Sequence, residues 1–257
     1  MCAQGLGKEV YLRRAKTGNP RKTEEIILAA GAALEAVLLV VILAFEFADN
    51  WIVAVRQVTV GIALALSIVI AVLERKRPQI FLAAAMAFTF VSDVFLVLLD
   101  DRYLLAVSLF AAAQILHFVR IALTRKAFLG SLLARIAVSG ALIGALAIAR
   151  VLSPLFAAGS VYAVNLVFNL IDSALSVKRE KRMILSLVGF ALFALCDVTV
   201  GLNGIGRGLG IPETFLYAGI CLTWAFYLPS QVLIVFSGSE PEKPLFSTLR
   251  KRGKEDE

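Results

Sequence analysis

Long apolar segments separated by short polar connections dominate the pattern of this sequence. Each segment has about the 20 residues that a helix needs to cross roughly 30 Å of hydrocarbon. Eight of them can be marked, at residues 26–47, 53–73, 80–99, 103–123, 129–149, 151–176, 184–203 and 214–236. Ser153-Pro154 marks the least distinct boundary, between the fifth and sixth segments. The pattern predicts an all-α, polytopic membrane bundle of eight transmembrane helices.

Two polar tails flank this predicted transmembrane domain. We expect residues 1–25 to form a basic cytoplasmic N-terminal tail, residues 26–236 the eight-helix domain, and residues 237–257 a charged cytoplasmic C-terminal tail. The first 25 residues contain six Lys or Arg and no apolar core, so a cleavable signal peptide is not expected. The first span is therefore predicted to act as an uncleaved signal anchor.

Basic residues between the apolar segments predict the orientation. They number six in 1–25, three at Arg75–Arg77, two at Arg125–Lys126, four in 178–182 and five after Ser237, which is 20 in alternate segments. The other four connections hold one basic residue each. Because Lys and Arg are enriched on the cytoplasmic side, both tails and the even-numbered loops are predicted to lie inside.

Composition excludes several other classes of protein. Hydrophobic residues make up 60% of the chain and charged residues 18%, which is not the balance of a soluble domain. The net charge of +7 sits in the connections, which favours anionic lipid headgroups over nucleic acid as its partner. One histidine and three cysteines without CxxC spacing predict neither a metal site nor another cofactor. We expect a multi-pass protein, of the plasma (inner) membrane if the source is bacterial, with no obligate protein partner.

Two aspartates lie inside apolar segments in matching contexts. The sequences are Ala-Phe-Thr-Phe-Val-Ser-Asp93-Val and Ala-Leu-Phe-Ala-Leu-Cys-Asp197-Val. Both spans run from inside to outside, and each aspartate lies 13 residues past its predicted start. At about 1.5 Å per residue, both lie roughly 20 Å from the inner boundary. The match favours a four-plus-four parallel repeat.

An ionised carboxylate in hydrocarbon is costly, so an intramembrane aspartate normally faces the bundle interior and marks a functional site. The alternative is a neutral acid that only bonds a neighbouring helix. Two close carboxyl groups in a low dielectric do not both ionise readily, which leaves one acid and one base. Such a pair can protonate one atom and activate a water molecule, and this makes Asp93 and Asp197 candidate catalytic residues.

The other charges in the apolar segments are expected to be structural or to belong to the same cavity. Glu35 lies near the middle of span one, where it either lines the cavity of the aspartates or forms a hydrogen bond in its neutral form. Asp172 lies near the basic cluster after span six and is predicted to be structural. Arg120 and Arg135 are expected to snorkel to the basic side. An interfacial charge network near the outer surface is predicted from Glu46, Asp49 and Arg56.

Uncharged polar side chains recur at helical spacing in spans four, six and eight. They are Gln114 and His117, then Tyr162, Asn165 and Asn169, then Tyr227 and Gln231 with Pro229 between them as an expected kink. Interhelical hydrogen bonding explains most such stripes. A polar cavity lined by spans three, four, six, seven and eight is the sharper interpretation. His117 is expected to be a hydrogen-bond partner rather than a base.

Several short motifs resemble the YhhN-like lysoplasmalogenase family. They are Phe-Thr-Phe-Val-Ser-Asp93-Val-Phe-Leu with Phe110-Ala-Ala-Ala-Gln114, and Leu192-Phe-Ala-Leu-Cys-Asp197 with Leu202-Asn203 and Tyr227-Leu-Pro-Ser-Gln231-Val-Leu-Ile. The resemblance implies an integral membrane hydrolase that cleaves the vinyl ether bond of a lysophospholipid substrate within the bilayer, giving a fatty aldehyde and a glycerophospho-base. It also implies that Asp93 and Asp197 are the catalytic pair. The predicted substrate-binding residues are Gln114, His117, Tyr162, Asn165, Asn203, Tyr227 and Gln231.

The chain departs from the family pattern in two places. Gln114 and His117 stand where the family tends to have His and then Tyr, and a Gly-rich stretch from Gly204 to Gly208 replaces an aromatic residue after Asn203. Three alternatives to the hydrolase therefore stay open. They are a proton- or cation-coupled transporter, an inactive lipid-binding relative, and an aspartyl protease, which is disfavoured because neither aspartate follows Gly-x-Gly.

Overall fold

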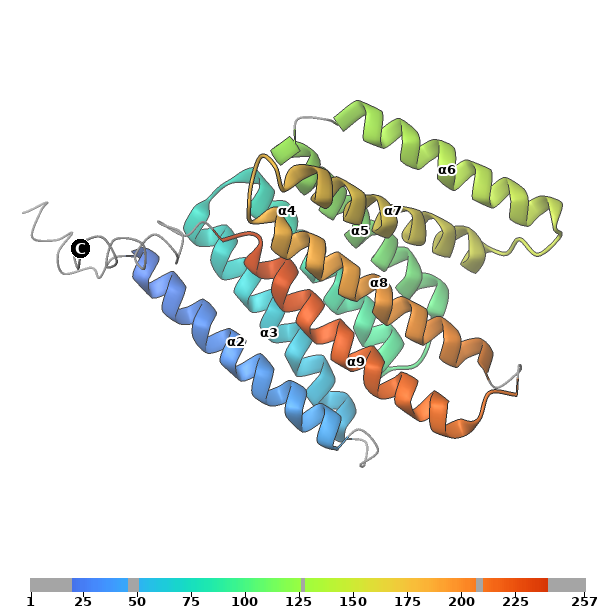
Figure 1. Ribbon diagram of the computed structural model, residues 1–257, viewed down its shortest axis with the longest axis horizontal. Coiled ribbons are helices and arrows are strands. Elements are labelled where there is room, and N and C mark those ends of the chain that lie inside the picture. The colour runs from blue at the N-terminus through green and yellow to red at the C-terminus, as the bar shows by residue number, and fades with distance from the viewer. Residues whose placement is uncertain (1–19, 46–50, 126–127, 207–209, 240–257) are drawn as a thin grey trace, which may run out of the picture.

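A computed structural model describes residues 20–45, 51–125, 128–206 and 210–239 of the chain. Within these ranges every regular element is a helix (Figure 1). The elements are α2 (Pro20–Ala44), α3 (Trp51–Glu74), α4 (Arg77–Asp93), the π-helix η1 (Val94–Leu98), α5 (Tyr103–Arg125), α6 (Phe128–Ile148), α7 (Pro154–Ser176), α8 (Met183–Gly206) and α9 (Glu213–Phe236). With α4 and η1 taken as one span, eight helices are long and apolar enough to cross a membrane. The predicted eight-helix bundle is confirmed.

The connection between α6 and α7 is clearer in the structure than in the sequence. Arg150 has a left-handed backbone with φ of 60°, which ends the preceding helix. The side chain of Ser153 then caps α7 by accepting a hydrogen bond from the backbone N–H of Phe156 at 3.2 Å, and Pro154 occupies the first turn. The sixth span therefore begins at residue 154, and its predicted start at residue 151 is wrong.

The same pairs of neighbouring helices are in contact in the two halves of the chain. In the first half α2 packs on α3, α3 on α4, and α4 on α5; in the second half α6 packs on α7, α7 on α8, and α8 on α9. The contacts between halves also correspond, because α9 packs on α2 and α3 as α5 packs on α6 and α7. This correspondence supports the predicted four-plus-four repeat and places α4 and α8, which carry the two aspartates, at equivalent positions.

The outside of the bundle is apolar, as a lipid-facing surface requires. Many large hydrophobic side chains are exposed there, among them Val40, Leu129, Ile136 and Ile148. Figure 1 shows α6 at the edge of the bundle, where few of its side chains are buried. Hence apolar contacts hold this helix less than they hold the central ones.

A buried ion pair joins α6 to α7. The guanidinium of Arg135 lies 2.8 Å from the Asp172 carboxylate and donates to the side-chain oxygens of Asn165 at 2.9 Å and Asn169 at 3.0 Å. The acceptors recur on one face of α7 and satisfy the charge inside the bundle, and Arg135 is only 3% exposed. The prediction that Arg135 snorkels to the basic side is therefore wrong. Asp172 was predicted to be structural, and its ion pair with Arg135 is such a role.

Arg120 is also buried, so the second predicted case of snorkelling is wrong too. Its guanidinium donates to the hydroxyl of Ser237 and to the carbonyl of Ile234 at 3.5 Å. Both acceptors lie at the C-terminal end of α9, where unpaired carbonyl groups and the helix dipole favour a cation. Arg120 thus ties α5 to the end of α9.

Replacing Asp172 by Ala is expected to lower the free energy of unfolding by about 3–5 kcal/mol, because a buried guanidinium would lose its counter-charge. Denaturant titration of the purified protein in detergent micelles measures the change. Asp101→Ala is the matched control, since Asp101 is exposed in a connection. Equal stability of the two variants would show that Arg135 does not depend on the pair.

Both tails are predicted to be cytoplasmic, and Figure 1 shows the start of α2 and the end of α9 at the same end of the bundle. A single cysteine placed in either tail of a cysteine-free protein should react with a membrane-impermeant maleimide only after cells are permeabilised. Arg102→Cys, in a connection on the predicted outer side, should react in intact cells. The reverse pattern would overturn the orientation taken from the basic residues.

Candidate functional site

A cavity of about 320 Å³ opens between α4, η1, α5, α7, α8 and α9. Most of its wall is apolar and aromatic. Its polar members are Asp93, Tyr162, Cys196, Asp197, Thr223 and Tyr227. The structure therefore brings the two intramembrane aspartates, from spans three and seven, to one cavity, with a tyrosine from span six and another from span eight.

Asp93 lies where the regular helix α4 gives way to the π-helix η1. A π-helical turn widens the backbone and is frequent at functional sites, because it changes the direction of neighbouring side chains. The carboxyl group is buried, with 4% of the residue exposed, and it accepts a hydrogen bond from the Tyr227 hydroxyl of α9. Leu96 and Val97, within the π-helix, form the adjoining wall.

Asp197 also lies on the cavity wall, but it is half-buried. It lies within α8 and accepts a hydrogen bond of 2.6 Å from the hydroxyl of Tyr162, which comes from α7. Each aspartate thus has its own phenolic donor from a different helix. These donors do not follow the four-plus-four repeat, because Tyr227 and Tyr162 come from non-equivalent helices of the two halves.

Aromatic rings line the cavity beside the two carboxyl groups. Phe193 lies one helical turn before Asp197 on α8, and its ring centroid is 5.5 Å from Tyr227, 6.1 Å from Phe110 and 6.5 Å from Tyr162. Trp224 packs edge to face on Tyr227 at 5.8 Å. The rings pack against both tyrosines that donate to the carboxyl groups.

The described lining residues include no Lys, Arg or His. Burial of a carboxylate without a counter-charge favours its neutral form, while a phenol hydrogen bond stabilises the ionised form. The site therefore offers two carboxyl groups, each with a phenolic donor, on the wall of one cavity. In the described ranges, no cluster of three or more His, Cys, Asp or Glu side chains could hold a metal ion.

Of the seven predicted substrate-binding residues, the structure places Tyr162 and Tyr227 on the cavity wall. It does not place the other five there: Gln114, His117, Asn165, Asn203 and Gln231. Gln114 accepts a hydrogen bond of 2.8 Å from Asn169, and Asn165 binds Arg135. These polar groups of α5 and α7 join helices, which is the other interpretation of their spacing.

His117, Gln231 and Asn203 also contact residues that do not line the cavity. His117 packs edge to face on Phe190, with ring centroids 5.2 Å apart. Gln231 donates to the Ser230 hydroxyl at 3.2 Å. The Asn203 amide lies against Gly219 of α9, so close that a Cβ there would be 2.5 Å from its oxygen.

Phe110, Phe193 and Trp224, which also form the wall, were not among the predicted site residues. Phe110 and Phe193 belong to the motifs that carry the family resemblance, and Phe193 precedes Asp197 by four residues, which puts both on one helix face. This spacing could have identified Phe193 as a residue of the cavity wall. Thr223 and Trp224 lie four and three residues before Tyr227 on α9, so the same helical spacing from a predicted site residue was available for them.

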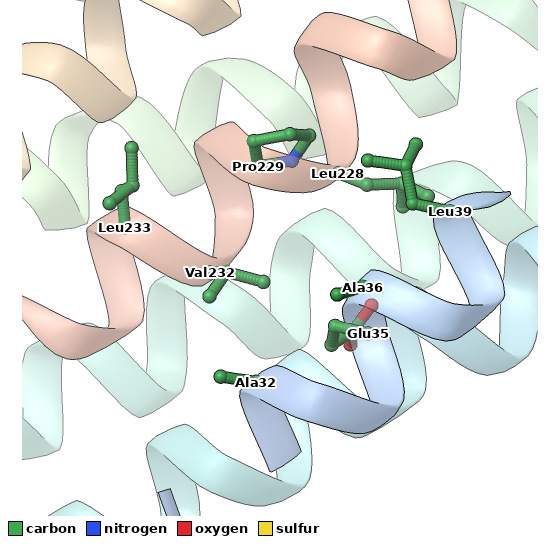
Figure 2. A pocket seen from close by; sticks show the side chains of 8 residues that line it. All are labelled: Ala32, Glu35, Ala36, Leu39, Leu228, Pro229, Val232 and Leu233. Carbon is green, nitrogen blue, oxygen red and sulfur yellow. The ribbon is translucent and has the colours of Figure 1, made fainter. Parts of the chain in front are cut away.

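Two other predictions concern charged residues away from this cavity. Glu35 does not line it, so that alternative is wrong; it lies in a separate pocket between α2 and α9 (Figure 2). Of the predicted interfacial network, Glu46 and Asp49 lie outside the described residues. The Arg56 guanidinium stacks over the Trp224 ring, 4.7 Å from its centroid.

Comparison with known protein families assigns the chain to one of them. The model of the YhhN family matches residues 51–238. The chain belongs to the YhhN family. The matched part of this YhhN protein runs from α3 to the end of α9 and holds both aspartates and both tyrosines, whereas α2 and Glu35 lie outside it. No curated protein and no solved structure matches the chain.

Removing either phenolic hydroxyl should destabilise this YhhN protein. Tyr227→Phe leaves the buried Asp93 without its donor, and Tyr162→Phe leaves the half-buried Asp197 without its donor. We expect each change to lower the free energy of unfolding by about 1–3 kcal/mol. Tyr103→Phe removes an exposed hydroxyl that binds Asp100 and should change stability by less than about 0.5 kcal/mol. Denaturant titration in micelles compares them, and equal effects at all three positions would contradict the assigned hydrogen bonds.

Proposed function

We propose that this YhhN protein is a membrane hydrolase that cleaves the vinyl ether bond of lysoplasmalogen-type lipids. The supporting observation is that Asp93 and Asp197, each with a tyrosine donor, line one cavity inside the bundle. The products would be a fatty aldehyde and a glycerophospho-base.

The reaction needs an acid and a base. The vinyl ether carbon next to the alkyl chain takes a proton, which leaves an oxocarbenium ion at the carbon bonded to oxygen. Water adds to that carbon after giving up a proton, and the resulting hemiacetal collapses to the aldehyde and the alcohol. One protonated and one ionised carboxyl supply both roles, and we assign them to the pair jointly.

The tyrosines and the aromatic wall fit the same reaction. A phenol hydrogen bond stabilises whichever carboxyl is ionised, and it fixes the direction of the other oxygen atom. The oxocarbenium ion carries positive charge, which the faces of aromatic rings attract. Phe193, Trp224 and Tyr227 provide such rings beside the carboxyl groups.

The size of the cavity limits what it encloses. Its volume of about 320 Å³ is at the lower end of the roughly 300–1,000 Å³ of ligand pockets. We therefore expect it to enclose the vinyl ether and the carbons on either side, with most of the alkyl chain along the apolar outside of the bundle.

Proton- or cation-coupled transport is the second candidate function. The correspondence of helix contacts between the two halves favours it, because parallel repeats with acidic residues within the membrane occur in transporters. Proton-coupled flux in liposomes, without cleavage of a lysolipid, would select this candidate over the hydrolase.

Asp93→Asn and Asp197→Asn are each expected to lower aldehyde release by about 10²–10⁴-fold, the usual contribution of a general acid or base. The assay uses purified protein with alkenyl and acyl lysophospholipids, and only the alkenyl lipid should yield aldehyde. Asp101→Asn, an exposed carboxyl outside the site, serves as the control and should keep full activity.

Unfolding titrations of the same variants separate loss of chemistry from loss of folding. Full activity of either Asp93→Asn or Asp197→Asn would remove the proposed mechanism.

A further inference from the structure

A second cavity, which the proposed hydrolysis does not use, lies between α2 and α9. We call it the α2–α9 groove; its volume is about 240 Å³. Figure 2 shows its eight lining side chains, four from each helix. From α2 come Ala32, Glu35, Ala36 and Leu39, and from α9 come Leu228, Pro229, Val232 and Leu233. Glu35 is the one charged or polar side chain among them.

Glu35 is buried, with only 4% of the residue exposed, and its Oε1 atom has no hydrogen-bond partner among the described residues. The other described side chains of the groove cannot supply one, because all are aliphatic. Pro229 also lacks a backbone N–H. An unpaired buried acceptor costs free energy, and such groups are rare in native proteins. The groove therefore provides a carboxyl oxygen that a ligand can satisfy.

The depth of Glu35 restricts the ligand. It is the tenth of the 19 residues in the candidate span Ile26–Ala44, which puts it about 13 Å from either end at roughly 1.5 Å per residue. A phosphate or another ionised headgroup at that depth would lie in hydrocarbon. A lipid with a small, uncharged polar end can reach it.

The hydrogen-bonding capacity of the Glu35 carboxyl group then restricts which polar group the lipid can carry. Whether Glu35 is neutral or ionised, at least one of its oxygens accepts hydrogen bonds. A ligand that complements both states must donate one. We propose that the α2–α9 groove binds a single-chain neutral lipid whose hydroxyl end donates a hydrogen bond to Glu35.

The aliphatic side chains of both helices would hold the first carbons of that lipid, and Ala32 and Ala36 leave room for it beside α2. The groove is separate from the aspartate cavity, because α9 turns Tyr227 towards Asp93 and Pro229 and Val232 towards α2. It also depends on α2, which lies outside the part of the chain that matches the family. The proposal is therefore independent of the proposed hydrolysis.

Photolabelling of the full-length protein in lipid nanodiscs tests the proposal. The probe is a dodecanol that carries a diazirine near its hydroxyl end, and the control probe is the methyl ether of the same alcohol, which accepts but does not donate. We expect the alcohol to label peptides from residues 32–39 and 228–233, and the ether to label them roughly two- to tenfold less, the effect of one hydrogen bond. Equal labelling by the two probes would overturn the proposal.

Variants separate the carboxyl group from the shape of the groove. Glu35→Leu should reduce labelling by the alcohol to the level of the ether, whereas Glu35→Gln keeps an acceptor oxygen and should keep most of the labelling. Ala36→Leu leaves Glu35 in place and narrows the groove, so it should reduce labelling by both probes. Full labelling of a folded Glu35→Leu protein would overturn the proposal, as would full labelling of Ala36→Leu.

Discussion

The cost of an unpaired polar group in hydrocarbon is the constraint on which this structure depends. The bilayer core offers no water, so each carboxyl and guanidinium group inside the bundle needs a partner from another helix. Asp93 and Asp197 meet this requirement with one tyrosine hydroxyl each, from α9 and α7. These two hydrogen bonds connect four helices around one cavity and leave the remaining oxygen atoms of the carboxyl groups available for chemistry.

The same constraint has other outcomes elsewhere in the bundle. Arg135 and Asp172 satisfy each other and two asparagines, so their charges serve to hold the peripheral helix α6. Glu35 has an oxygen atom without a partner among the described residues, beside a groove of aliphatic side chains. A buried charged group whose hydrogen bonds are all satisfied, such as Arg135, joins helices. A group with an unpaired oxygen atom, such as Glu35, can bind another molecule.

Much of the fold follows from the sequence, because span length and apolarity are local properties. The eight spans, the matching contexts of the two aspartates and the family needed no tertiary information. The pairing of buried polar groups, in contrast, depends on how the helices pack. Arg135 was expected to snorkel to the basic side, but acceptors on α7 hold it inside the bundle. The polar stripe of α5 was expected in the cavity, yet Gln114 binds Asn169 instead. Similarly, the π-helix after Asp93 has no marker in an apolar run, and Trp224 reaches the cavity only because α9 packs against the aspartate-bearing helices.

The most direct test of the acid–base account is hydrolysis of an alkenyl lysophospholipid in D₂O, with the aldehyde trapped as it forms and analysed by mass spectrometry. If a carboxyl of the aspartate cavity protonates the vinyl ether carbon, the aldehyde should carry one deuterium on the carbon next to its carbonyl group. An added aldehyde of different chain length, recovered without deuterium, excludes exchange after release. A product without deuterium at that carbon, or no aldehyde at all from the wild-type protein, would contradict the account.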